Sequence, residues 1–68
     1  MSQKFDVVVY EMRSRKVESV IGKNMPRSKG SFHTAEKRLD TAFSRINLER
    51  YSACIVEAGK YSVGDVLP

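Results

Sequence analysis

One segment, residues 34–48 with the sequence TAEKRLDTAFSRINL, has the period of an amphipathic helix and constrains the fold most. Its apolar residues recur at intervals that bring them to one side of an α-helix. They are Ala35, Leu39, Ala42, Phe43 and Ile46. The Thr34 hydroxyl can cap the first turn, and Glu36 suits the positive end of the helix dipole. We therefore predict one helix from Thr34 to Leu48, with Phe43 and Ile46 buried.

Three other segments are rich in β-branched and aromatic residues and are predicted as strands: 4–12, 16–23 and 51–58. The first is apolar on both of its alternating sides, which favours a central position. The simplest chain path places the last strand antiparallel beside the first. We predict a single α+β domain over residues 1–68, with β-β-α-β order, a mainly antiparallel three-stranded sheet in the order 2-1-3, and the helix on one face. The alternative places the last strand parallel to the second, through a right-handed crossover.

The hairpin between the first two strands decides which side chains face the helix. No Asn-Gly or Asp-Gly pair marks a two-residue turn, so a loop of three to five residues is expected. A three-residue loop at 13–15 puts Val7 opposite Ile21 and Val9 opposite Ser19. The helix-facing side then contains Phe5, Val7, Val9, Val17 and Ile21. A slip of one residue would exchange the two faces.

The second face of the sheet is also apolar and needs a cover. Its residues are Val8, Tyr10, Met12, Val20, Cys54 and Val56. The tail, residues 60–68, has apolar residues around a Gly64-Asp65 turn signal, and we expect it to cover part of this face or to contact another chain. A contiguous apolar patch on a small protein often marks a contact surface. Homodimerisation and binding of another protein both follow from this feature.

The net charge of +4 is unevenly placed, because residues 1–33 carry all of it and residues 34–68 are neutral. The excess lies at the hairpin tip and in the loop predicted over residues 24–33. Its cations are opposed only by Glu18 and are Arg13, Arg15, Lys16, Lys23, Arg27 and Lys29. Any electrostatic function is therefore expected in this part of the chain.

The chain lacks the residue sets that catalysis requires. His33 is the only histidine and Cys54 the only thiol, and no pattern brings them together as base and nucleophile. Glu36 and Asp40 share one helical face, but such pairs are common on solvated helices. Residues 22–31 do not have the order of a phosphate-binding loop, and no Cys and His pair has metal-ligand spacing. We predict a protein that is not an enzyme and that uses no metal and no cofactor.

The sequence also bears on location and stability. No apolar run approaches the roughly 18 residues of a membrane span, and the start, MSQKFD, lacks the order of a signal peptide. These features predict a cytoplasmic protein without membrane contact. A single cysteine in 68 residues excludes an intramolecular disulfide, so the core or a partner must stabilise the fold.

Taken in order, KFDVVVYEM, KVESVIGKNM, TAEKRLDTAFSRI and YSACIVEAGKYSVGDVL resemble the small uncharacterised accessory proteins of tailed bacteriophages, of the early, host-takeover type. Small phage proteins that inhibit host enzymes, including a short inhibitor of bacterial RNA polymerase, are similar in strand-strand-helix-strand order. The resemblance implies a bacterial host protein as partner and the host cytoplasm as location. It carries over no functional residues, since a shared architecture does not transfer function.

Together these features predict a small basic binding module that contacts another protein and modulates it by occupying a surface. Tyr10 and Met12 are the expected apolar anchors. Arg13, Arg15 and Lys16 are expected to steer an acidic partner towards them.

The alternative is a nucleic-acid-binding protein that uses the hairpin tip and loop, residues 13–29. The same tip cations would then contact phosphates together with Lys23, Arg27 and Lys29. No aromatic residue lies between Arg13 and Lys29, and the chain has no RNP-like or helix-turn-helix pattern.

Overall fold

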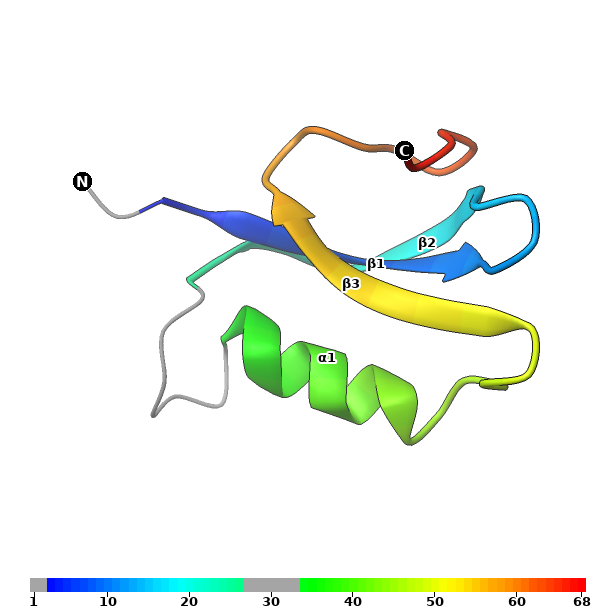
Figure 1. The fold of residues 1–68 in the computed structure, drawn as a ribbon. Coiled ribbons are helices and arrows are strands. Elements are labelled where there is room, and N and C mark those ends of the chain that lie inside the picture. Colours follow the sequence, from blue (N-terminus) through cyan, green and yellow to red (C-terminus); the bar gives the residue numbers. More distant parts are fainter. Residues whose placement is uncertain (1–2, 27–33) are drawn as a thin grey trace.

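The computed structural model describes residues 3–26 and 34–68, which form a three-stranded sheet with a helix on one face and the tail on the other (Figure 1). The strands are β1 (Phe5–Glu11), β2 (Val17–Met25) and β3 (Tyr51–Glu57), and the helix is α1 (Ala35–Phe43). Both outer strands are antiparallel to β1, in the order β2-β1-β3. The predicted α+β fold, its β-β-α-β order and its sheet order are confirmed. The alternative, in which the last strand pairs with the second after a right-handed crossover, is wrong, because β3 pairs with β1.

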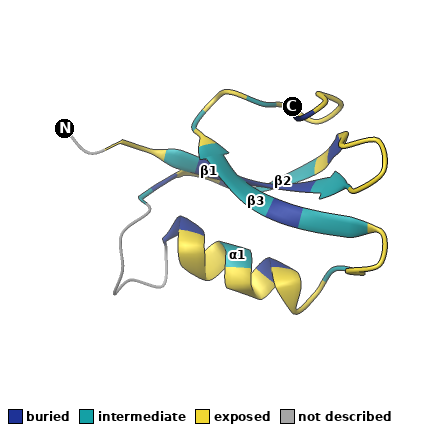
Figure 2. Ribbon diagram, viewed as in Figure 1, coloured by how far each residue is buried: buried dark blue, intermediate teal, exposed yellow. Residues whose placement is uncertain are grey.

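β1 is central because it supplies buried side chains to both faces of the sheet. Val7 packs with Met25 and Ala35 on the helix side, and Val8 packs with Val17 and Leu67 on the tail side. Val7 and Val8 are both fully buried. In Figure 2, α1 is exposed along most of its length and is buried where it meets the sheet.

The register of β1 and β2 differs from the predicted one because β2 contains extra residues. The pairing shifts three times between Phe5↔Met25 and Tyr10↔Val17. Val9 pairs with Ser19 as predicted, whereas Val7 pairs with Gly22 and not with Ile21. Each extra residue is a bulge, which leaves one residue without a partner and turns the strand locally.

Because of the bulges, one residue predicted to face the helix lies on the other face of the sheet. Val17 packs with Val8 on the tail side, so its predicted place under the helix is wrong. The other four predicted residues do lie in the clusters beneath α1: Phe5, Val7, Val9 and Ile21. The N–H of Glu11 donates to the carbonyl of Lys16 at 3.0 Å and closes a four-residue loop. This length lies within the predicted three to five residues and is one residue longer than the loop at 13–15.

α1 begins as predicted but ends at Phe43, well before Leu48. Thr34 is the N-cap, and its Oγ1 accepts a hydrogen bond from the N–H of Lys37 at 3.2 Å. At the other end the Ser44 hydroxyl donates to the carbonyl of Thr41 at 2.8 Å. Side chains that bind nearby backbone groups compete with helix formation. The residues after Phe43 therefore form turns that lead into β3.

The apolar stripe of α1 is narrower than predicted. Ala35 and Ala42 are buried, and Leu39 and Ile46 are half-buried against the sheet. Phe43 is 38% exposed, so its predicted burial is wrong. Successive helical residues are rotated by about 100°, and Phe43 follows directly after the buried Ala42. Phe43 belongs to neither of the buried clusters between α1 and the sheet.

This arrangement predicts a smaller loss of stability for Phe43→Ala than for Leu39→Ala. Phe43→Ala should lower the free energy of unfolding by no more than about 1 kcal/mol, because Phe43 is 38% exposed and belongs to none of the buried clusters. Leu39→Ala should lower it by about 2 kcal/mol or more, because Leu39 packs against two buried clusters. Urea unfolding followed by circular dichroism measures both. A larger loss for Phe43→Ala than for Leu39→Ala would contradict the orientation of the helix.

The tail lies across the second face of the sheet and is hydrogen-bonded to the start of β2. The N–H of Val17 donates to the carbonyl of Asp65 at 2.8 Å, and the carbonyl of Val17 accepts the N–H of Gly64 at 2.9 Å. Leu67 is buried in the cluster that contains Val8 and Val17. The tail therefore covers part of the second face, the first of its two expected roles.

Candidate partner-binding surface

Three segments that are distant in the sequence meet at one end of the sheet, beside the turn between β1 and β2 (Figure 1). The N–H of Met12 donates to the carbonyl of Arg50 at 2.9 Å, which joins the turn after α1 to the hairpin. Lys16 forms an antiparallel bridge with Val66, which joins the tail to the hairpin. The hairpin turn is thus in backbone contact with both the turn after α1 and the tail, and the three segments form the surface of this end of the sheet.

We call this surface the hairpin end. It consists of three exposed apolar side chains and four basic ones: Met12, Leu48, Val66, Arg13, Arg15, Lys16 and Arg50. The exposed fractions of the three apolar side chains are 40% for Met12, 53% for Leu48 and 62% for Val66. A hollow of about 490 Å³ lies between the hairpin and the turn after α1, lined by Met12, Arg13, Arg50, Glu11 and Glu49.

The basic side chains of the hairpin end are only partly paired with acidic side chains of this protein. The Glu11 carboxylate is engaged locally, because its Oε1 accepts the Ser14 hydroxyl at 2.8 Å and its Oε2 lies 3.8 Å from Nη2 of Arg50. Arg13 and Lys16 are exposed and form no ion pair within residues 3–26 and 34–68. Their charge can therefore act on an approaching acidic surface.

The structure places the two predicted anchors differently. Met12 is exposed at the hairpin end. Tyr10 is half-buried and packs against the cluster of Val8 and Leu67 beneath the tail. The guanidinium of Arg15 lies 5.7 Å from the centre of the Tyr10 ring, in cation–π geometry. Much of the Tyr10 ring is thus in contact with the protein itself.

The residues of the nucleic-acid alternative are only partly described. Lys23 is exposed towards the far end of β2, on the order of 20 Å along the strand from Lys16 at about 3.3 Å per residue. Arg27 and Lys29 lie outside the described residues. The structure therefore does not join Lys23 to the hairpin end.

The groups considered for catalysis are not brought together among the described residues. Cys54 is half-buried on the tail side of β3, and burial raises the pKa of its thiol while the charge of Arg15 partly offsets this. A thiol with a raised pKa is a weak nucleophile at neutral pH. Glu36 and Asp40 are exposed on α1, and His33 lies outside the described residues.

Neither a metal-binding cluster nor a membrane-crossing helix is found in the described part of the chain. Residues 3–26 and 34–68 contain no group of three or more His, Cys, Asp or Glu side chains placed to hold a metal ion. Over the same ranges, no helix has the length and apolar character needed to cross a membrane.

Sequence reasoning did not find three members of the hairpin end: Leu48, Arg50 and Val66. Leu48 was expected inside the helix, and the early helix end moves it into an exposed turn. The position of Val66 depends on the bridge between the tail and the hairpin, for which the sequence has no local signal.

Comparisons of the chain with family models, with curated proteins and with solved structures find no match.

Proposed function

We propose that this protein is a small, non-enzymatic binding module that contacts another protein through the hairpin end and modulates that protein by occupying its surface. In this proposal the partner presents an acidic rim around an apolar site. The resemblance to phage accessory proteins makes a bacterial host protein the first class of partner to test.

One observation supports the proposal most. Exposed Met12, Leu48 and Val66 come from three separate segments that backbone pairing brings together. Basic side chains accompany them, including Arg13 and Lys16. Protein interfaces combine an apolar centre with a charged, solvent-accessible rim, and a few central side chains supply most of the binding energy.

The proposal predicts two separable losses of binding in a pull-down from nuclease-treated bacterial lysate. The double variant Met12→Ser and Leu48→Ser should lose the captured protein, because it removes the exposed apolar centre. The double variant Arg13→Glu and Lys16→Glu should slow association and make capture weaker, because the charges that steer an acidic partner are reversed. Both doubles keep Arg15 and its contact with Tyr10.

The matched controls change the same residue types elsewhere. Val63→Ser alters an exposed apolar residue of the tail, and Lys37→Glu reverses an exposed charge on α1. Neither side chain belongs to the hairpin end, so capture should remain unchanged in both. Equal loss in the controls and in the hairpin-end variants would contradict the proposal.

The nucleic-acid alternative has a different salt dependence. Six phosphate contacts on duplex DNA give a log-log slope of about −5, so affinity falls roughly a thousandfold between about 50 and 200 mM salt. A protein contact with an apolar centre weakens far less. A parallel pull-down without nuclease tests this alternative. Recovery of nucleic acid alone, abolished by Arg13→Glu and Lys16→Glu but not by Met12→Ser and Leu48→Ser, would replace the proposal with it.

A further inference from the structure

A second concave surface lies between α1 and the edge strand β2, away from the hairpin end. The start of α1 is close to β2, since Ala35 packs with Met25 and Cγ of Arg38 lies 3.3 Å from the position that a Cβ on Gly22 would take. Further along α1, the buried cluster of Ala42 contains residues of β1 and β3, and Ile21 of β2 is only partly buried against it. Between this part of α1 and β2 lies a groove of about 370 Å³.

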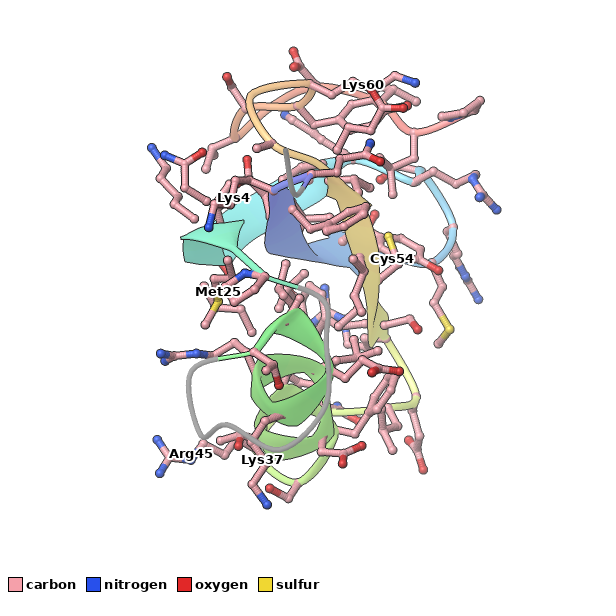
Figure 3. The ribbon with its side chains drawn as sticks, turned by 90° about the vertical axis from the view of Figure 1, so that its left-hand side faces the viewer. Lys4, Met25, Lys37, Arg45, Cys54 and Lys60 are labelled. Carbon is pink, nitrogen blue, oxygen red and sulfur yellow. The ribbon has the colours of Figure 1, made fainter. Side chains whose placement is uncertain are left out.

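The groove has an apolar floor and a basic rim. The residues that line it are Val9, Ser19, Ile21, Arg38, Thr41, Ala42, Arg45 and Ile46. Among the residues that the structure describes, two arginines are the only charged residues that line it, and none is acidic. Figure 3 shows Arg45, just after α1, extending on the side of the molecule where Met25 of β2 lies, whereas Lys37 points away from the sheet. An occupant that complements this surface carries carboxylates around an aliphatic side chain.

The backbone beside the groove is an available strand edge. β2 is an outer strand, and among the described residues no other strand lies along its outer edge. Among the described residues, the backbone hydrogen bonds between the tail and β2 are confined to Val17 at the start of the strand, next to the Lys16↔Val66 bridge. A free edge of this kind can pair with an extended segment of another chain.

We infer that the groove between α1 and β2 binds an extended acidic peptide segment of a partner protein, which adds as a strand to the edge of β2. Its side chains on the helix side enter the groove, where an aliphatic residue lies over Ile21 and Ile46. Carboxylates on either side of that residue pair with Arg38 and Arg45. The inference does not depend on the hairpin end.

The spacing of the two arginines gives the motif. Arg38 lies on α1, and Arg45 lies two residues after its end, in a turn whose N–H groups still donate to the carbonyl of Ala42. Seven residues at the helical rise separate their Cα atoms by about 10 Å. Alternate residues of a strand point to one face, and positions i and i+4 are about 13 Å apart. The long arginine side chains can span the difference. The favoured segment therefore has acidic residues at i and i+4 and an aliphatic residue at i+2.

A nucleic acid is a poorer fit for this groove. Within residues 3–26 and 34–68 no aromatic side chain lines it, so these residues offer no ring on which a base can stack. Two arginines would contact few phosphates, and the aliphatic floor would remain unused. A peptide uses both the charged rim and the floor.

The experiment is selection of a displayed random-peptide library on the immobilised protein, followed by fluorescence anisotropy with the enriched peptides. We expect enrichment of acidic residues at i and i+4 around an aliphatic residue. Arg45→Glu should weaken binding about tenfold or more, because a charge-assisted pair becomes a repulsion. Lys37→Glu, on α1, has the same change in net charge and should leave the affinity unchanged. Circular dichroism checks that both variants are folded.

Four results would overturn the inference. The first is enrichment of peptides without acidic residues, and the second is equal binding by Arg45→Glu and wild type. The third is equal weakening by Lys37→Glu, and the fourth is loss of peptide binding in the hairpin-end variants but not in Arg45→Glu. Sedimentation tests whether a second copy of this chain occupies the groove. If the wild type is a dimer, Arg45→Glu is a monomer and no peptide binds, the groove is assigned to a second copy. Peptide binding that survives Arg13→Glu and Lys16→Glu separates this site from the hairpin end.

Discussion

Asp6→Ala is expected to cost about 3 kcal/mol or more of folding stability, because it removes a buried carboxylate that accepts two backbone hydrogen bonds. Asp6 is 3% exposed on β1. Its Oδ1 accepts the N–H of Asn24 and its Oδ2 accepts the N–H of Gly59, both at 2.9 Å. Asn24 belongs to β2 and Gly59 follows β3, so one carboxylate joins the backbones on both sides of the central strand.

The expected loss follows from the conformations of the two donors. Asn24 has φ 52° and Gly59 has φ 78°, values that turn the chain away from regular strand geometry. A hydrogen bond to a charged group contributes about 1.5 to 3 kcal/mol, and a buried donor left unpaired is costly. A domain of this size has a total stability of roughly 3 to 10 kcal/mol. Asp6→Ala should therefore lower the melting temperature by about 12 to 24 °C.

The controls for this prediction separate the hydrogen bonds from the charge. Asp40→Ala removes an exposed carboxylate from α1 and should change stability by less than about 0.5 kcal/mol. Asp6→Asn keeps the shape of the side chain but presents an amide nitrogen to one of the two N–H donors, so it should recover only part of the loss. Thermal unfolding by circular dichroism measures all three variants. Equal melting temperatures for Asp6→Ala and Asp40→Ala would refute the role of Asp6.

The fold was predictable where a residue's environment depends on a local pattern. Alternation on both sides of β1 indicated a central strand, and the helical period of Ala35, Leu39 and Ala42 indicated the packed side of α1. The face of the sheet on which Val17 lies was not predictable. The bulges of β2 depend on contacts between residues that are distant in the sequence, such as the hydrogen bond from Asn24 to Asp6.

The candidate surfaces were predictable to different degrees. The cations at the hairpin tip follow from the sequence alone, because a charged turn between two strands is exposed. The contribution of Leu48 depends on where α1 ends, and that of Val66 depends on tertiary pairing. The groove had one signal in the sequence, the seven-residue spacing of Arg38 and Arg45, which places both on one side of a helix. The apolar floor beside them could only be located once the helix was positioned on the sheet.

Two neighbouring residues of the tail provide the second large prediction. Leu67 is 6% exposed and packs with Val8 and Val17, whereas Val66 is directed to solvent at the hairpin end. Leu67→Ala should lower the free energy of unfolding by about 2 to 4 kcal/mol, because it opens a cavity beside Val8. Val66→Ala should lower it by less than about 0.5 kcal/mol. Denaturant unfolding measures the free energy of unfolding of both variants, which differ from wild type at adjacent aliphatic residues of the tail.

The same pair separates stability from binding. If the hairpin end contacts a partner, Val66→Ser should weaken capture of that partner while the protein keeps its melting temperature. Leu67→Ala should lower the melting temperature, and below its unfolding transition it should still bind, because its side chain faces the core and not the solvent. Equal destabilisation by Leu67→Ala and Val66→Ala would contradict the position of the tail on the sheet. Unchanged capture by Val66→Ser would instead remove Val66 from the binding surface and leave the fold unaffected.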